Sequence, residues 1–319
     1  MKPTIPHHPA AGPVFSRPGR KKEKLPPPAS GDYNPKSSDY DRLIPSTHAV
    51  PEGNPPMNAL VTPTRPGRWY TPEGTPCLTV PAARGGERDP TLRDARKRGL
   101  FPSVTGILDL ISRPGLNAWI ISQGILSSLT LPRLSGETED AFAARIVKDM
   151  DAQRDNAALL GRRIHHALNQ VLTNFLPEPE ITPYLAGAAQ WFDAVGLQPL
   201  LVEADLVSPD WGFGGRIDLY AKIEGRPALV DFKSQQVKKG KPNFYENWPL
   251  QLAAYRQLVR ESGRTVDACY TVVIDSHPGQ PVHVREWAAE ELDFEAFAAT
   301  FALWKYLKGY DPLAPAPPD

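Results

Sequence analysis

The sequence contains very little cysteine and no long apolar run. Cys77 and Cys269 are the only cysteines among 319 residues, too few for a four-cysteine zinc or iron–sulfur site and too far apart to indicate a disulfide framework. No apolar run approaches the ~20 residues that a membrane-spanning helix needs, and the N-terminus lacks the apolar segment of a signal peptide. We therefore expect a protein of the reducing cytoplasm with no membrane partner.

The sequence also has no excess of charge of either sign. Lys plus Arg and Asp plus Glu both total 36, so the formal net charge is zero. A basic groove can coexist with an acidic active site elsewhere on a surface, so this balance neither favours nor excludes a nucleic-acid partner. The position of individual charges is therefore more informative than their sum.

Proline-rich composition separates two tails from a folded region. Residues 1–66 combine Pro, Gly, Ser and charge with few large apolar residues, and such a segment cannot bury enough surface to offset its chain entropy. We predict that it is a disordered tail, and the sequence does not identify a protein partner for it. The remaining predicted regions are a hairpin and short helix at 67–100, a helical region at 101–198, a sheet-rich core at 199–309 and a second disordered tail at 310–319.

The hydrophobic pattern changes from helical to strand-like near residue 198. Before it, a short helix is predicted that Thr91 caps, with Asp94 three residues on, and that Gly99 ends. The longest helical pattern runs from Glu137 to about Phe175 with one expected break. After it come five strand-like runs, "PLLVEADLVS", "GFGGRIDLYAKI", "RPALVDFKS", "DACYTVVIDS" and "PVHVREWA".

One helix separates the third strand-like run from the fourth, and another follows the fifth. A meander of strands joined to a crossover helix and further strands gives a mixed sheet covered by helices. The predicted fold class is therefore α/β (α+β), with a central sheet of about five strands flanked by helices and a helical region before it.

Three charged residues lie near the ends of these apolar strands. Asp218 closes the second strand, and Asp231 and Lys233 share one face near the end of the third, because strand side chains alternate. Burying such groups without partners costs several kcal/mol. A shared divalent cation removes the repulsion between the acids, and oxygen ligands favour Mg²⁺ or Mn²⁺. Lys233 would then hold a water or neutralise charge beside a phosphate; a structural ion-pair network is the alternative.

Five motifs in order resemble the PD-(D/E)XK nuclease superfamily, and its RecB-like exonuclease branch in particular. They are "GRRIHHAL", "VEADLV", "GGRID", "DFK" and "QLAAYR". The proline of the family name is absent before the first acid; the sequence there is "GGRID", in which Asp218 is that acid. The resemblance covers roughly residues 100–275. Within this branch, the sequence resembles phage-type and mitochondrial-genome-maintenance-type single-strand exonucleases.

This resemblance implies a restriction-endonuclease-like core with Mg²⁺ or Mn²⁺ and, given the two cysteines, no iron–sulfur cluster. The metal ligands that it implies are His165, Asp218, Asp231 and the Phe232 carbonyl. The catalytic residues that it implies are Asp218, Asp231, Lys233, Glu203, Gln251 and Tyr255. For Glu203, a direct role and a role in holding a water or capping the site are equally open. Gly214 and Gly215 predict either a close approach of backbone or a sharp turn at the mouth of the site.

The segment "SQQVKKGKPNFYENW" interleaves positive charge with aromatic rings. Channels for single-stranded DNA use this combination, in which stacking contributes about 1–3 kcal/mol per base. The alternative is a solvated loop whose rings pack on the domain. The nucleic-acid contacts predicted here and beside His165 are Lys238, Lys239, Lys241, Tyr245, Trp248, Arg162 and Arg163.

Together these features predict a metal-dependent DNA exonuclease acting on single-stranded or free ends, in phage or bacterial DNA processing, recombination or repair. One alternative is a sequence- or structure-specific endonuclease of the same fold. Another is a catalytically silent nucleic-acid-binding protein, which the intact set of two acids and a lysine disfavours, because binding alone needs no buried acids facing phosphates.

Overall fold

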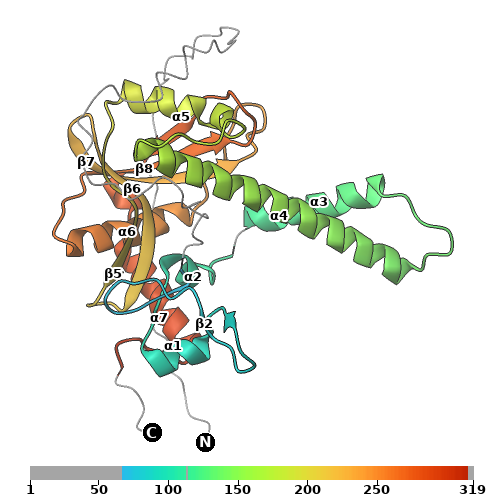
Figure 1. Ribbon diagram of the computed structural model, residues 1–319, viewed down its shortest axis with the longest axis horizontal. Coiled ribbons are helices and arrows are strands. Elements are labelled where there is room, and N and C mark those ends of the chain that lie inside the picture. Colours follow the sequence, from blue (N-terminus) through green and yellow to red (C-terminus); the bar gives the residue numbers. More distant parts are fainter. Residues whose placement is uncertain (1–66, 113, 315–319) are drawn as a thin grey trace, which may run out of the picture. The chain divides into compact units, whose positions relative to one another are not determined.

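A computed structural model describes residues 67–112 and 114–314; the predicted tail at 1–66 and the last five residues lie outside the described part. At its centre is a five-stranded sheet in the order β5-β6-β7-β8-β9 (Figure 1). The strands are β5 (Gln198–Ser208), β6 (Phe213–Ile223), β7 (Arg226–Gln235), β8 (Ala268–Asp275) and β9 (His283–Glu286).

The sheet is mixed because one connection crosses over. β7 and β8 run parallel, and helix α6 (Trp248–Glu261) joins them, whereas the other neighbours are antiparallel. A parallel pair needs such a crossover, since a short turn can only reverse the chain. The predicted mixed sheet flanked by helices is confirmed.

Two apolar layers cover the two faces of the sheet. Successive residues of β8 alternate between them, with Val272 in one layer and Val273 in the other, as the period of two in a strand requires. The first layer packs β-strand residues against α6 together with α2 (Val104–Leu108) and α7 (Phe294–Lys308). The second packs them against α5 (Thr182–Ala194) and the C-terminal half of α4 (Glu139–Leu172).

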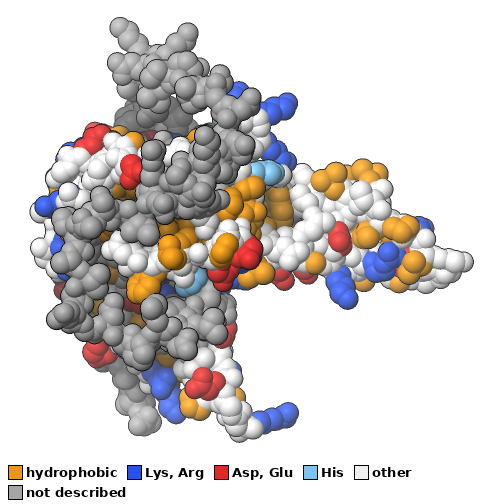
Figure 2. Space-filling view, turned by 45° about the horizontal axis from the view of Figure 1, so that its top comes forward, with side chains coloured by type: hydrophobic (Ala, Val, Ile, Leu, Met, Phe, Trp, Pro, Cys, Tyr) orange, Lys and Arg blue, Asp and Glu red, His pale blue; other side chains and the backbone are white. Residues whose placement is uncertain are grey.

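Helix α4 is continuous over 34 residues, so the predicted break in this region is wrong. Its interior contains no proline, and its Gly161 packs against the sheet. The N-terminal half lies beside α3 (Pro114–Thr130), where Ser127 Oγ donates to Asp149 Oδ2 at 2.7 Å. Apolar side chains are exposed on this helix pair, among them Ile121, Ile125 and Leu129 (Figure 2). In the described part of the chain, no helix is both long and apolar enough to cross a membrane.

The segment before α2 packs against strand β6 of the sheet. β1 (Trp69–Tyr70) pairs with β4 (Phe101–Pro102), while Tyr70 makes only an isolated bridge with Pro76. The hairpin expected at the start of residues 67–100 is present as a tight antiparallel turn, in which the Cys77 N–H donates to the Trp69 carbonyl at 2.8 Å, but the longer pairing of β1 is with β4. A second short pair joins β2 (Val80–Pro81) to β3 (Glu87–Arg88).

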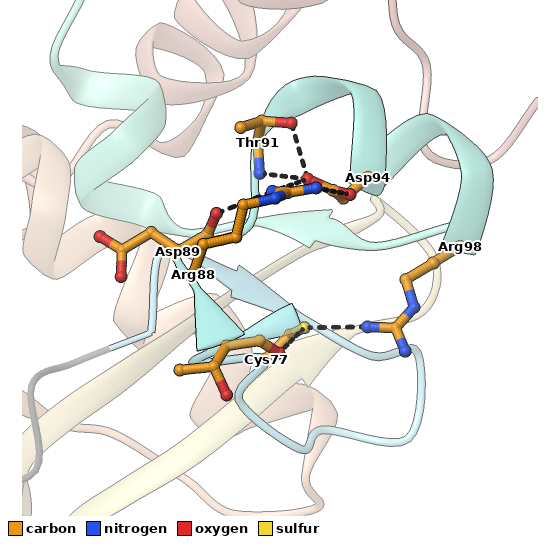
Figure 3. Close-up of polar contacts among 7 residues, drawn as sticks. Cys77, Arg88, Asp89, Thr91, Asp94 and Arg98 are labelled. Atoms are coloured by element: carbon orange, nitrogen blue, oxygen red, sulfur yellow. Dashed lines mark hydrogen bonds and ion pairs between the residues drawn. The ribbon is translucent and has the colours of Figure 1, made fainter. Parts of the chain in front are cut away.

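Helix α1 (Leu92–Arg98) has the boundaries that its sequence predicts. Asp94 Oδ2 accepts from the Thr91 backbone N–H at 2.8 Å and from its hydroxyl at 2.7 Å, and Gly99 ends the helix at φ +64 (Figure 3). Arg88 donates to both oxygens of Asp94. The N-terminal cap is therefore tied to the preceding strand.

The chain after α7 returns to the fold instead of leaving it at residue 310. Tyr310 Oη donates to the carbonyl oxygens of Leu100 at 2.8 Å and Ala95 at 3.1 Å, and its ring lies beside Trp69 and Trp304. Tyr310 thus packs with the first apolar layer, so the chain is still part of the fold at the residue where the predicted tail begins.

Candidate active site

The candidate site lies where β6 and β7 stop pairing. Their ladder ends at the Leu219–Val230 pair; beyond it β6 continues with β5 alone and β7 with β8 alone. Asp218 and Asp231 are the next residues on the two strands. Asp218 Oδ2 accepts from the Phe232 backbone N–H at 2.8 Å, and so satisfies an amide that the separation of the strands leaves without a ladder partner. The two acids therefore stand at the start of a fork in the sheet.

Glu203 enters this fork through an unusual backbone conformation. Its φ is +49, in the left-handed region, at a cost of about 1–3 kcal/mol for a residue other than glycine. Val202 packs in one apolar layer and Ala204 in the other, although a regular strand would place both on the same face. This break in the alternation brings the Glu203 carboxylate next to Asp218.

His165 is brought to the fork by the close packing of α4 on β7. A Cβ on Gly161 would lie 2.7 Å from Ser234 Oγ, so the glycine permits this approach. His165 follows one helical turn later on the same face. Its Nδ1 lies 3.8 Å from Asp218 Oδ2.

The protonation state of His165 suits a metal ligand. Burial and then the positive charge of Lys233 lower its pKa to about 4, so the ring is neutral at pH 7, although part of the side chain reaches solvent. Neutral imidazole is the form that binds a cation.

One histidine and two acids form a compact donor set. The candidate ligand atoms of His165, Glu203 and Asp218 all lie within 4.8 Å of one another. Burial and then the charge of Asp218 raise the pKa of Glu203 to about 8, and burial also raises the pKa of Asp218. Crowded, half-buried carboxylates are unfavourable alone and favourable around a dication. The set therefore fits a divalent metal ion.

Asp231 belongs to a second polar network, which lies beside this donor set and consists of an ion pair and hydrogen bonds. Its Oδ2 lies 2.6 Å from Lys233 Nζ, and its Oδ1 accepts from Gln251 Nε2 at 3.2 Å. Gln251 Oε1 accepts from Lys233 Nζ at 3.1 Å, and its Nε2 also donates to Tyr255 Oη at 3.1 Å. The structure thus brings together the four residues Asp231, Lys233, Gln251 and Tyr255.

The Asp231 carboxyl retains one oxygen that its surroundings satisfy poorly. Oδ2 is fully buried and lacks a hydrogen bond of ordinary geometry in the described part of the chain, despite the nearby ammonium of Lys233. Burial raises the pKa of Asp231 to about 6. This oxygen faces the Lys233 ammonium, and Asp231 is not among the residues of the compact donor set.

The two glycines of "GGRID" permit close packing, as predicted. A Cβ on Gly214 would lie 2.9 Å from the ring of Tyr70, and one on Gly215 would lie 2.6 Å from the ring of Tyr255. Gly215 therefore lets Tyr255 reach the position from which it holds Gln251.

The residues predicted to contact nucleic acid divide into two groups. Lys238, Lys239, Lys241 and Arg162 are exposed, whereas Arg163 pairs with Glu178 at 2.8 Å. Trp248 is only 7% exposed, and the Tyr245 ring packs against it with centroids 5.1 Å apart. The charges of this loop face solvent, but its rings face inward, so the structure does not present the stacking surface that the sequence suggested.

Sequence reasoning missed the ion pair beneath Glu203. Arg216 donates to both oxygens of Asp205, at 3.0 Å and 2.6 Å, and the two residues are cross-strand partners. Asp205 also raises the pKa of Tyr70 by charge and hydrogen bonding, after burial. The sequence signals that could have indicated this ion pair are the second acid of "VEADLV", Asp205, and the arginine two residues before Asp218.

The fold and the site together define an α/β protein with a metal-ligand set and an adjacent lysine at a fork in a mixed sheet. The family model for the PD-(D/E)XK nuclease superfamily matches residues 125–304, more than half of the chain. The chain therefore belongs to the PD-(D/E)XK nuclease superfamily, whose members use divalent metal ions and act on nucleic acids.

Comparisons with individual proteins add little to this assignment. No curated protein matches the sequence. Among solved structures, a protein from Eubacterium rectale assigned as an exonuclease is 12% identical, with 47% of this chain and 68% of that chain covered and a TM-score of 0.35. A protein named SSO0001 is 13% identical, with coverage of 64% and 98% and a TM-score of 0.27.

Proposed function

We propose that this protein is a metal-dependent deoxyribonuclease that acts as an exonuclease on single-stranded DNA ends. The observation that supports this most is the position of the Asp231–Lys233 pair beside the donor set of His165, Glu203 and Asp218. The setting that we propose is phage or bacterial DNA processing, recombination or repair in the cytoplasm.

The donor set defines what a bound cation would contribute. His165, Glu203 and Asp218 would hold Mg²⁺ or Mn²⁺, and Asp231 Oδ2 is a further buried oxygen at the same fork. Bound there, the ion would supply Lewis-acid activation of a phosphoryl oxygen. Neutral His165 can act as a ligand without losing a proton, and a bound cation would relieve the repulsion between the two acids.

Lys233 is held so that its ammonium faces the reacting phosphate. Gln251 Oε1 accepts one hydrogen bond from Nζ, and Asp231 Oδ2 forms an ion pair with it, so the ammonium keeps a proton for a phosphate oxygen or the attacking water. About a fifth of the side chain, 22%, is exposed, so a substrate can reach it. Tyr255 fixes the orientation of the Gln251 amide. This arrangement places a positive charge where negative charge develops during hydrolysis.

Digestion of end-labelled DNA tests the proposal. Single strands and duplexes labelled at either end, and closed single-stranded circles, are incubated with Mg²⁺, with Mn²⁺ or with EDTA. We expect loss of the single strands, intact circles and no activity in EDTA. Lys233→Gln should lower the rate by about 10²-fold or more, whereas Lys222→Gln, an exposed lysine on β6, should not.

The outcomes also separate the alternatives. Cleavage of closed circles would refute the exonuclease assignment and favour an endonuclease. DNA binding without metal-dependent cleavage would indicate a catalytically silent nucleic-acid-binding protein.

A further inference from the structure

Three lysines stand on a tight turn just after β7, which we call the lysine turn (Lys238–Lys241). Lys238 and Lys241 form an antiparallel bridge, and the Lys241 N–H donates to the Lys238 carbonyl at 3.1 Å. Lys239 and Gly240 have φ of +53 and +66. Two successive residues in the left-handed region favour Asn-Gly, so a lysine in the first position costs about 1 kcal/mol or more.

The charges of the lysine turn have no counterpart within the fold. All three lysines are exposed, and none of them forms an ion pair with any residue in 67–112 or 114–314. Like charges so close together repel one another. A strained turn that nevertheless carries three lysines within four residues favours an anionic ligand with several charges.

Both ends of the loop that carries the turn are fastened to the sheet. Gln235 Nε2 donates to the Asn243 carbonyl at 2.9 Å, and the Asn243 N–H donates to Gln235 Oε1 at 3.1 Å. Asp275, a buried acid at the end of β8, accepts from the Val237 N–H at 3.4 Å and from His277. The lysines are therefore presented from a fixed base and not from a free loop.

The aromatic rings of the loop serve as its anchors. Phe244 packs against Trp248 and Trp287, with ring centroids 6.0 Å and 6.4 Å apart. Tyr245 packs against Trp248 and against the start of α3, where a Cβ on Gly115 would overlap its ring. These rings are turned toward the protein, so the loop offers positive charge without a stacking surface.

The lysine turn lies close to the candidate active site. Gln235 is two residues beyond Lys233 and on the same face of β7, so the anchor of the turn is about 7 Å from Lys233 along the strand. Asp275 is the cross-strand partner of Gln235 on β8. The turn thus extends the surface of the fork along the carboxyl ends of these two strands.

We propose that the lysine turn is a phosphate subsite that binds the sugar–phosphate backbone of the substrate strand by charge, without stacking its bases. Gln235 and Asp275 act as positioning residues for it. This inference rests on the proposed function, since it assumes a nucleic-acid strand at the fork.

Salt-dependent binding of a fluorescent single-stranded oligonucleotide in EDTA tests the subsite. The variant is Lys239→Asn with Lys241→Gln; asparagine suits the left-handed position, so the fold should be retained. Each lost phosphate contact lowers the slope of log K against log salt by about 0.7, so we expect a decrease of about 1.4. Lys222→Gln is the matched control and should keep the wild-type slope. With an abasic strand of equal length, the double variant should lose the same amount of slope as with the ordinary strand.

Two results would overturn the subsite alone. One is a double variant with the wild-type slope while the wild-type protein binds and digests DNA. The other is a loss of affinity for the abasic strand in the wild-type protein that disappears in Lys239→Asn with Lys241→Gln, since the lysine turn would then contact the bases. A wild-type protein that binds no DNA would overturn the proposed function together with the subsite.

Discussion

Replacing Glu203 by glutamine should stabilise the metal-free protein and abolish its activity. Burial and the nearby Asp218 raise the pKa of Glu203 from its ordinary 4.5 to about 8. The folded protein therefore binds this proton more tightly than the unfolded chain does. Stability is consequently lost as the pH rises from about 4.5 toward 8, where the unfolded chain has released the proton and the folded protein still holds it.

The size of the effect follows from this difference in bound protons. One proton held only by the folded state costs about 1.4 kcal/mol per pH unit. Because the folded protein itself releases about half of this proton by pH 8, the total between pH 6 and pH 8 is about 2 kcal/mol. Solvent reaches Glu203 in part and reduces this to about 1–2 kcal/mol. Glutamine does not titrate, so the stability advantage of Glu203→Gln should grow by that amount. Groups common to both proteins, such as His165, largely cancel in the comparison.

Urea unfolding of both proteins in EDTA, at pH 6 and pH 8, measures this difference. Glu224→Gln is a matched control, because Glu224 is exposed and also has a left-handed backbone, with φ +51. Mg²⁺ should then stabilise the wild-type protein more than Glu203→Gln, because it binds only the folded state. A Glu203→Gln protein that is less stable than wild type at pH 8 without metal would refute the reasoning.

Three further predictions concern packing around the site. Gly161→Ala should lower the rate of DNA digestion, because its Cβ would lie 2.7 Å from Ser234 Oγ, and Ser234→Ala in the same protein should restore the rate. Gly215→Ala should lower the free energy of unfolding in urea by about 1–3 kcal/mol, because it crowds the buried Tyr255 ring; an unchanged value would contradict this. Ser103→Ala removes the cap that accepts from Gly106 N and should cost about 1 kcal/mol in the same assay, with digestion unchanged.

Features that depend on neighbouring residues could be predicted from the sequence. The five strands of the sheet follow from apolar patterns that repeat every two residues or run unbroken, and α1 follows from its cap at Thr91 and its stop at Gly99. The same local logic assigned Asp218, Asp231 and Lys233 to two consecutive strands. The prediction that Asp218 closes its strand was wrong, because β6 continues to Ile223 and both acids lie in mid-strand, where the pairing of β6 with β7 stops. A short turn between strands makes them neighbours, so these three residues had to lie close together.

The division of roles within the site depended on contacts between distant segments. The left-handed backbone at Glu203 and the end of the β6–β7 ladder bring Glu203 into the donor set, while Lys233 and Gln251 engage Asp231. Packing partners far away in sequence likewise turned Trp248 inward. The sequence by itself therefore determined which chemical groups reach the fork, because strand periodicity is local. Only the tertiary structure decided which of them face one another, because that depends on where two strands separate and on what packs against them.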